Sequence, residues 1–136
     1  MRISSLATIP SLATATNVEN HYSYELYGGS FSLFAQAGYL PGAPELEVSC
    51  AASAISADHY IDDATGELRP PTVPCTWEHP QPVESWATIH FNFTAKTYTV
   101  KHTFVGASGM NDTAAGTSGY LSSVNNDFDI PVTEFA

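Results

Sequence analysis

Apolar and polar side chains alternate at every second position from residue 21 onward, and helical spacing is scarce. The apolar positions hold mostly aromatic and β-branched residues, which suit a pleated surface. The pattern predicts strands at 21–27, 31–37, 46–50, 86–94, 97–104, 120–121 and 128–132. A break at Gly28-Gly29 separates the first two, and a Gly/Ser/Thr-rich stretch, 106–119, precedes the last two. We therefore expect an all-β fold, a compact antiparallel β-barrel or β-sandwich.

The strands at 86–94 and 97–104 follow one another closely enough to predict their register. Odd positions are apolar in the first strand and even positions in the second. Because residues opposite one another in an antiparallel pair share a face, Ile89 should lie opposite His102. The turn between the strands would then be Ala95-Lys96.

The same register bears on a metal site, since His90 and His102 come from neighbouring strands. They fall on opposite faces of the predicted pair. A metal site needs three or four converging ligands, and the sequence shows no such convergence. We therefore predict no metal and no cofactor, and we expect His102 to be a hydrogen-bonded histidine of the core or its rim.

The two cysteines, Cys50 and Cys75, enclose a long segment that ends in prolines. A redox pair needs a short motif with one thiol at a helix start, and a structural zinc site needs more cysteines or nearby histidines. Cys50 instead ends a strand that places Leu46, Val48 and Cys50 on one face. A disulfide closing a loop of roughly 25 residues would stabilise the fold by on the order of 3–4 kcal/mol. We predict this disulfide rather than free thiols.

The length and net charge of the chain limit the number of domains and the kinds of partner that we expect. The chain has 136 residues, which suits one domain, and 14 acidic against 4 basic residues give it a formal charge of −10. Such a charge repels nucleic acid and anionic membrane surfaces, so neither is an expected partner. The chain also has five histidines, whose protonation in acid reduces the net charge. We expect a monomer that self-associates weakly at acid pH.

The start of the chain has the outline of a signal peptide, but polar residues interrupt its apolar centre. We expect residues 1–16 to be a flexible leader or a signal or pro-segment remnant, and 17–136 to be the folded domain. Two glycosylation sequons, at Asn92 and Asn111, and the even cysteine count favour a secreted, extracellular protein.

No Gly-x-Ser-x-Gly, Walker or His-Glu-x-x-His motif occurs in the sequence. Asp58 and His59, together with Asp62 and Asp63, could supply a general base and its orienting carboxylate. A solvated acidic loop has the same composition, however. We therefore predict a binding protein and not an enzyme.

The segment 56–68 is the expected partner-contacting surface. Connections longer than ~12–15 residues are usually functional or disordered, and the predicted disulfide holds this one at both ends. It surrounds an aromatic and an aliphatic residue with negative charge, which suits a basic protein partner. The contact candidates are Asp58, Tyr60, Ile61, Asp62, Asp63 and Glu67. Alternatively, Tyr60 and Ile61 only pack the loop onto the domain.

Several segments carry a family resemblance. Residues 45–52 (ELEVSCAA), the strand that ends Phe91-Asn92-Phe93 after the second cysteine, and the run Tyr98-Thr99-Val100-Lys101 resemble the core of the fungal Alt a 1 family, the major Alternaria allergen and its relatives. The strand ending Tyr27-Gly28 is similar to that family's first strand. The likeness spans residues 18–133. The amino-terminal cysteine that links some members into dimers is absent.

The resemblance implies a small secreted fungal protein of the allergen, elicitor or virulence-effector type. It would act by binding a host protein, such as a thaumatin-like defence protein, or a small phenolic ligand. A carbohydrate-binding module is the rival interpretation, because exposed tryptophans on a β-sandwich can stack against sugar rings. Trp77 and Trp86 are the candidates. Alternatively, Trp77 packs beside the disulfide and Trp86 covers one end of the domain.

Overall fold

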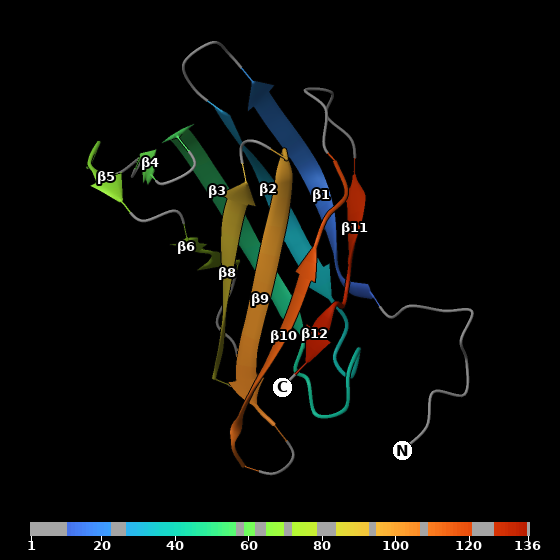
Figure 1. Ribbon diagram of the computed structural model, residues 1–136. Helices are drawn as coiled ribbons and strands as arrows, with labels where there is room; N and C mark the ends of the chain where they lie inside the picture. Colours follow the sequence, from blue (N-terminus) through green and yellow to red (C-terminus); the bar gives the residue numbers. More distant parts are fainter. Residues whose placement is uncertain are drawn as a thin grey trace.

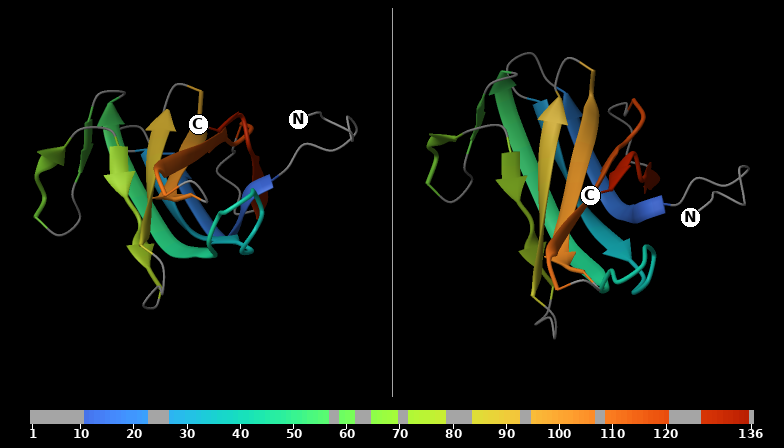
Figure 2. Two further views of the ribbon diagram at one scale, coloured as in Figure 1. Left: turned by 90° about the horizontal axis from the view of Figure 1, so that it is seen from below. Right: turned by 60° about the horizontal axis from the view of Figure 1, so that its bottom comes forward.

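The computed structural model shows two layers of β-strands packed face to face (Figure 1 and Figure 2). Within the described part of the chain there is no helix, and hence none long and apolar enough to cross a membrane. The structure describes residues 11–22, 27–56, 59–61, 65–69, 72–78, 84–92, 95–106, 109–120 and 127–135.

The first sheet is the rear layer in Figure 1 and has seven strands among the described residues. Its order is β11-β1-β2-β3-β4-β5, and β7 pairs separately with β3. The bounds are β1 Ser11–Tyr22, β2 Tyr27–Ala35, β3 Leu46–Ser56, β4 His59–Ile61, β5 Leu68–Arg69, β7 Thr76–Trp77 and β11 Phe128–Pro131.

The second sheet is the front layer and has five strands among the described residues, in the order β12-β10-β9-β8-β6 (Figure 1). The bounds are β6 Thr72–Pro74, β8 Ser85–Asn92, β9 Thr97–Val105, β10 Asn111–Thr117 and β12 Glu134–Phe135. The two sheets do not close into a barrel. The all-β prediction is therefore confirmed, in its sandwich form.

The core lies between the inner faces of the two sheets. Leu46, Val48 and Cys50, which the pattern places on one face, are all buried. Phe31 of β2 and Tyr98 of β9 meet across the interface edge to face, with ring centroids 4.8 Å apart. Alternation along these strands thus arises because one side of each strand packs against the other sheet.

Strand β1 begins earlier than the pattern indicates. Ser11–Tyr22 is one strand that pairs with β2 and, over its first half, with β11. Leu12 and Ala15 are fully buried. Residues 11–16, which we expected to belong to a flexible leader or a signal or pro-segment remnant, lie instead in β1. Alternating Ala and Thr give little contrast in hydropathy, so the pattern does not reveal this strand. Residues 1–10 lie outside the described part of the chain.

Strands also form in other segments where none is predicted, among them the short strands β4, β5, β6, β7 and β12. β2 runs through Gly28-Gly29, where the pattern predicts a break, and β10 occupies half of the Gly/Ser/Thr-rich stretch 106–119. β10 pairs with β9 along its whole length, so neighbouring strands outweigh a weak local preference. Tyr120, predicted to begin a short strand, belongs to none and is exposed.

The β8–β9 hairpin has the predicted faces but a register that differs by two residues. Ile89 pairs with Val100, and not with His102 as predicted. A shift of two keeps every side chain on its own face, so alternation alone cannot detect it. The last pair of the described residues is Asn92 with Thr97, and Lys96 adopts a left-handed φ of 55°.

Candidate functional site

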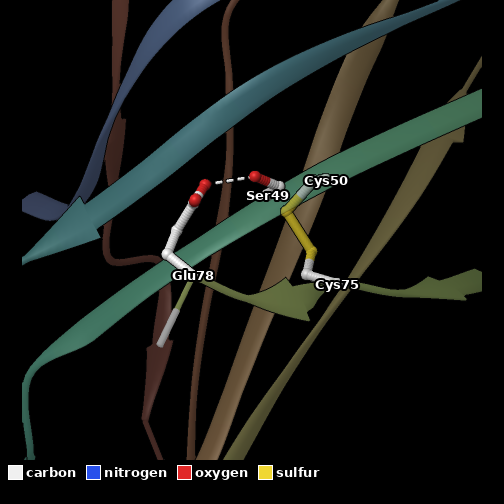
Figure 3. The surroundings of a disulfide bond; sticks show 4 residues. All are labelled: Ser49, Cys50, Cys75 and Glu78. Atoms are coloured by element: carbon white, nitrogen blue, oxygen red, sulfur yellow. Dashed lines mark hydrogen bonds between the residues drawn. A yellow bond between two sulfur atoms is a disulfide. The ribbon is translucent and has the colours of Figure 1, made fainter. Parts of the chain in front are cut away.

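Cys50 and Cys75 form the predicted disulfide (Figure 3). Their Cα atoms are 4.5 Å apart across a sequence separation of 25. Cys75 lies where the chain passes from β6 in the second sheet to β7 in the first, and its N–H donates to the Ala87 carbonyl of β8. Beside the bond, the Ser49 hydroxyl donates to the Glu78 carboxylate. The disulfide therefore fastens β3 to the segment that crosses between the sheets.

The two tryptophans have different environments. Trp77 is half-buried against the core, and its Nε1 donates to the Ser85 carbonyl at 3.2 Å. Trp86 lies on the outer face of the second sheet and is 42% exposed. Of the two candidates for stacking on a sugar, Trp86 alone offers an open ring.

Trp86 belongs to a surface that we call the threonine face, formed by outward positions of β6, β8, β9 and β10. Its members are Thr72, Trp86, Thr88, His90, Asn92, Thr97, Thr99, Lys101, Thr103, Val105, Asn111, Thr113 and Thr117. The Oγ1 atoms of Thr99 and Thr117 are 3.0 Å apart, as are those of Thr103 and Thr113. Because β-branched side chains are stiff at χ1, the sheet holds these hydroxyls in a fixed array.

A hollow of about 220 Å³ opens in the threonine face. It is lined by Thr72 of β6, Thr88 and His90 of β8, and Thr99 and Lys101 of β9. Strand pairing places His90 between Thr72 and Thr99, and Thr88 opposite Lys101. Trp86 lies two residues from Thr88 on the same face of β8, about 7 Å along the strand. The hollow and the exposed ring are therefore parts of one surface.

The charge on this surface differs from that of the rest of the protein. Within its four strands the sequence has one acid, Asp112, whose carboxylate lies against Gly106 and which pairs with inward-facing Phe104. Glu134 on β12 pairs with Ala115, which in turn pairs with Lys101. Along this row of strand pairs, the acid nearest to Lys101 is therefore Glu134, which lies two strands away. In a chain of formal charge −10, the threonine face is locally basic.

A larger hollow, of about 400 Å³, lies on the outer face of the first sheet beside the disulfide. It is lined by Ser30, Phe31, Ser32, Ser49, Cys50, Ala51, Pro74 and Thr76. Phe34, 45% exposed, lies on the same face and pairs with Glu47. The described side chains of this face combine hydroxyls with carboxylates and include no cation. We therefore regard it as the weaker candidate for a ligand with a negatively charged group.

His102 lies in the core, away from both hollows. It is fully buried, and its Nδ1 is 2.7 Å from the Tyr39 hydroxyl, with the two rings stacked. Burial lowers the pKa of His102 from 6.5 to about 4 and raises the pKa of Tyr39. The prediction of a hydrogen-bonded core histidine is confirmed. Among the described residues, no three His, Cys, Asp or Glu side chains gather as metal ligands do.

The predicted partner-contacting segment 56–68 is described only in part. Outside the described residues lie Asp58, Asp62 and Asp63. Tyr60 and Ile61 belong to β4, which pairs with β3 and β5, and Glu67 is exposed just before β5. The segment thus has short strands of its own, and its contact with a partner stays a prediction.

The two glycosylation candidates, Asn92 and Asn111, are both exposed, as a glycan acceptor must be. They lie at opposite ends of the threonine face, since Asn92 ends β8 and Asn111 begins β10. The Asn92 Oδ1 also accepts a hydrogen bond from the Ala95 N–H at 3.0 Å. Their glycosylation stays a prediction.

Sequence reasoning misses Lys101, Thr99 and Tyr39 as residues of interest. A signal for the first two exists, because Thr97, Thr99, Lys101 and Thr103 are the polar half of the alternation that predicts β9. Treating these four positions as one surface would have identified the threonine face. Tyr39 follows β2 in a turn, where no periodic pattern applies.

Comparison of the chain with protein-family models, with curated proteins and with solved structures finds no match. The resemblance to the Alt a 1 family therefore stays a prediction from the sequence. The case for a function rests on the geometry of the chain itself.

Proposed function

We propose that this chain is a secreted, non-catalytic domain that binds carbohydrate through the threonine face. The observation that carries the proposal is the exposed ring of Trp86 beside an ordered array of hydroxyls. A sugar has C–H groups on the faces of its ring and hydroxyls around its rim. An indole ring packs against the first, and threonine hydroxyls exchange hydrogen bonds with the second.

Preorganisation of the face supports the proposal. The side-chain hydroxyls of Thr103, opposite Trp86 in the strand pairing, and of Thr113 are already held by their mutual hydrogen bond. Side chains that are ordered before binding lose little conformational entropy when a ligand arrives. An aromatic anchor such as Trp86 is also the kind of residue in which most of the binding energy of an interface is concentrated.

The test is binding of the purified protein to insoluble chitin, β-glucan and cellulose, followed by titration with soluble oligomers of the polymer that binds. Trp86→Ala should reduce affinity by roughly tenfold or more, since an anchor residue contributes about 2 kcal/mol. Phe34→Ala is the matched control, because Phe34 is equally exposed but on the outer face of the first sheet. Equal affinity of Trp86→Ala and the parent, or no binding to any glycan, would reject the proposal.

A second candidate function is the elicitor or effector type that the resemblance implies, with a host protein as partner. One structural observation favours it. Strands β4 and β5 extend to one side of the sandwich in both views (Figure 1 and Figure 2), and exposed Glu67 precedes β5. A projecting acidic hairpin suits a basic partner, such as a thaumatin-like protein.

Leaf infiltration of the purified protein tests this second candidate. The protein should cause cell death or a defence response. The triple change Tyr60→Ala, Asp62→Asn and Asp63→Asn should weaken that response while leaving the thermal midpoint within a few degrees. A folded triple variant with undiminished activity would assign the segment to a connecting role only.

A further inference from the structure

The hollow of the threonine face combines two nitrogen-bearing side chains with hydroxyls in a protein that is otherwise acidic. Lys101 is exposed, and among the described residues it has no ion-pair partner. His90 lies on the neighbouring strand, one pair further along, and Thr72, Thr88 and Thr99 complete the lining. Each hydroxyl can donate one hydrogen bond and the ammonium three.

The acidic residues that the structure describes lie outside the lining of the hollow, which makes its ammonium and hydroxyls selective for an anion. The chain has 14 acidic residues and 4 basic ones, yet none of the members of the threonine face is acidic. An unpaired ammonium surrounded by hydroxyl donors attracts an oxyanion, because hydrogen bonds to an ionised acceptor are about twice as strong as neutral ones. Neutral sugars need no such cation.

We propose that the hollow holds the carboxylate of an acidic sugar, a uronic acid residue, while a ring of the same oligosaccharide stacks on Trp86. This inference rests on the proposed carbohydrate function and adds the chemical class of the sugar. Lys101 supplies the charge, and hydroxyls of Thr88 and Thr99 donate to the carboxylate oxygens. The separation of about 7 Å along β8 between Trp86 and Thr88 lets one oligosaccharide reach both.

The whole-molecule charge indicates a carboxylate on a sparsely charged glycan, not a densely sulfated one. At −10 the protein repels a polyanion over distances up to the Debye length, ~8 Å at physiological salt. One carboxylate that enters the hollow meets Lys101 at close range, whereas many sulfates spread along a chain meet mostly negative surface. The favoured ligand is therefore a short or partly esterified uronan.

The probes are a partly methyl-esterified oligogalacturonide hexamer, its fully methyl-esterified form and a sulfated glucan oligomer, each titrated into the parent and into variants. The two uronide forms differ by the negative charge of the carboxylates. Lys101→Gln removes the cation and keeps a long polar side chain. Lys96→Gln is the control, since it removes the same charge from the β8–β9 turn, outside the hollow.

The acidic hexamer should bind the parent more tightly than the ester, and Lys101→Gln should reduce that affinity by roughly tenfold without changing affinity for the ester. Lys96→Gln should leave both nearly unchanged. Trp86→Ala should weaken both forms. Equal affinities for acid and ester, an equal effect of Lys101→Gln on both, or a preference for the sulfated oligomer would overturn the acidic-sugar inference and leave carbohydrate binding standing. No binding to any of these three oligomers would also overturn the acidic-sugar inference, whereas carbohydrate binding is rejected only if chitin, β-glucan and cellulose fail as well.

Discussion

At the scale of single residues, the Tyr39–His102 pair shows how burial sets chemistry. His102 sits on an inner position of β9, where the pattern calls for an apolar residue. It is tolerated because the Tyr39 hydroxyl contacts its Nδ1 and because the ring packs beside Tyr39 and Phe104. Its Nε2 is buried without a hydrogen-bond partner among the described residues. Protonation would place a charge in the core with nothing to offset it.

The pair predicts a loss of stability in mild acid. The pKa of His102 is about 4 in the folded protein and near 6.5 when unfolded, so between these values the unfolded chain binds more protons. The free energy of unfolding should therefore fall as pH falls from 6.5 to 4, by on the order of 3 kcal/mol from this group. Urea unfolding at pH 7, 5.5 and 4 measures it.

His102→Gln is the comparison, because an amide can still bond to Tyr39 and does not titrate in this range. The variant should lose less stability than the parent between pH 7 and pH 4. Carboxylates affect both proteins alike, so the difference between the two slopes reports His102. Identical slopes would contradict the role given to its burial.

At the scale of elements, alternation along the sequence identifies which strands have a buried side and cannot locate their partners. It predicts the inward faces of β3, β8 and β9 correctly because one side of each strand packs on the opposite sheet. It misses the register of β8 against β9, since a slip of two residues preserves every face. It misses β10 and the first half of β1, where Ala, Gly and Thr give no contrast.

The candidate site was predictable to a similar degree. Trp86 is a stacking candidate from the sequence because tryptophan is rare and the fold is a β-sandwich. Its exposure, and the hollow beside it, depend on which residues of β6 and β10 lie next to β8 and β9. Those neighbours come from pairing across long stretches of chain, which a local pattern does not encode.

Gly116 of β10 lies so close to β11 that one added methyl group should destabilise the protein. Gly116 of β10 is buried, and a Cβ there would lie 2.0 Å from the Pro131 carbonyl oxygen of β11. This nearest atom belongs to the backbone, and the Ile130 side chain follows at 2.9 Å, so Gly116→Ala must push the two strands apart. We expect a loss of about 1–3 kcal/mol, seen as a thermal midpoint lower by several degrees.

Gly119→Ala is the control for that substitution. Gly119 lies three residues further along, and a Cβ there meets nothing within 4 Å. Its thermal midpoint should match that of the parent within experimental error. If Gly116→Ala is as stable as Gly119→Ala, the two strands approach one another less closely than the structure shows.

At the scale of the whole molecule, the net negative charge opposes self-association and the exposed apolar surface favours it. At neutral pH the formal charge of −10 keeps copies apart. Exposed Val105 and Met110 adjoin at the β9–β10 turn, where Gly106 N–H donates to the Met110 carbonyl, and Trp86 lies on the same face. The charge is what prevents this apolar end from associating with another copy.

The balance predicts weak self-association in acid. The sequence pI is about 4.5, so at pH 5 most of the net charge is neutralised and repulsion between copies falls. Light scattering should show a higher average mass at pH 5 than at pH 7.5. The double change Val105→Thr and Met110→Ser should abolish that rise. Tyr120→Ser is the control, because Tyr120 is as exposed as Met110, at 70%, but follows the opposite end of β10. A constant mass across this pH range, or an equal rise in the double variant, would show that this apolar end does not join copies.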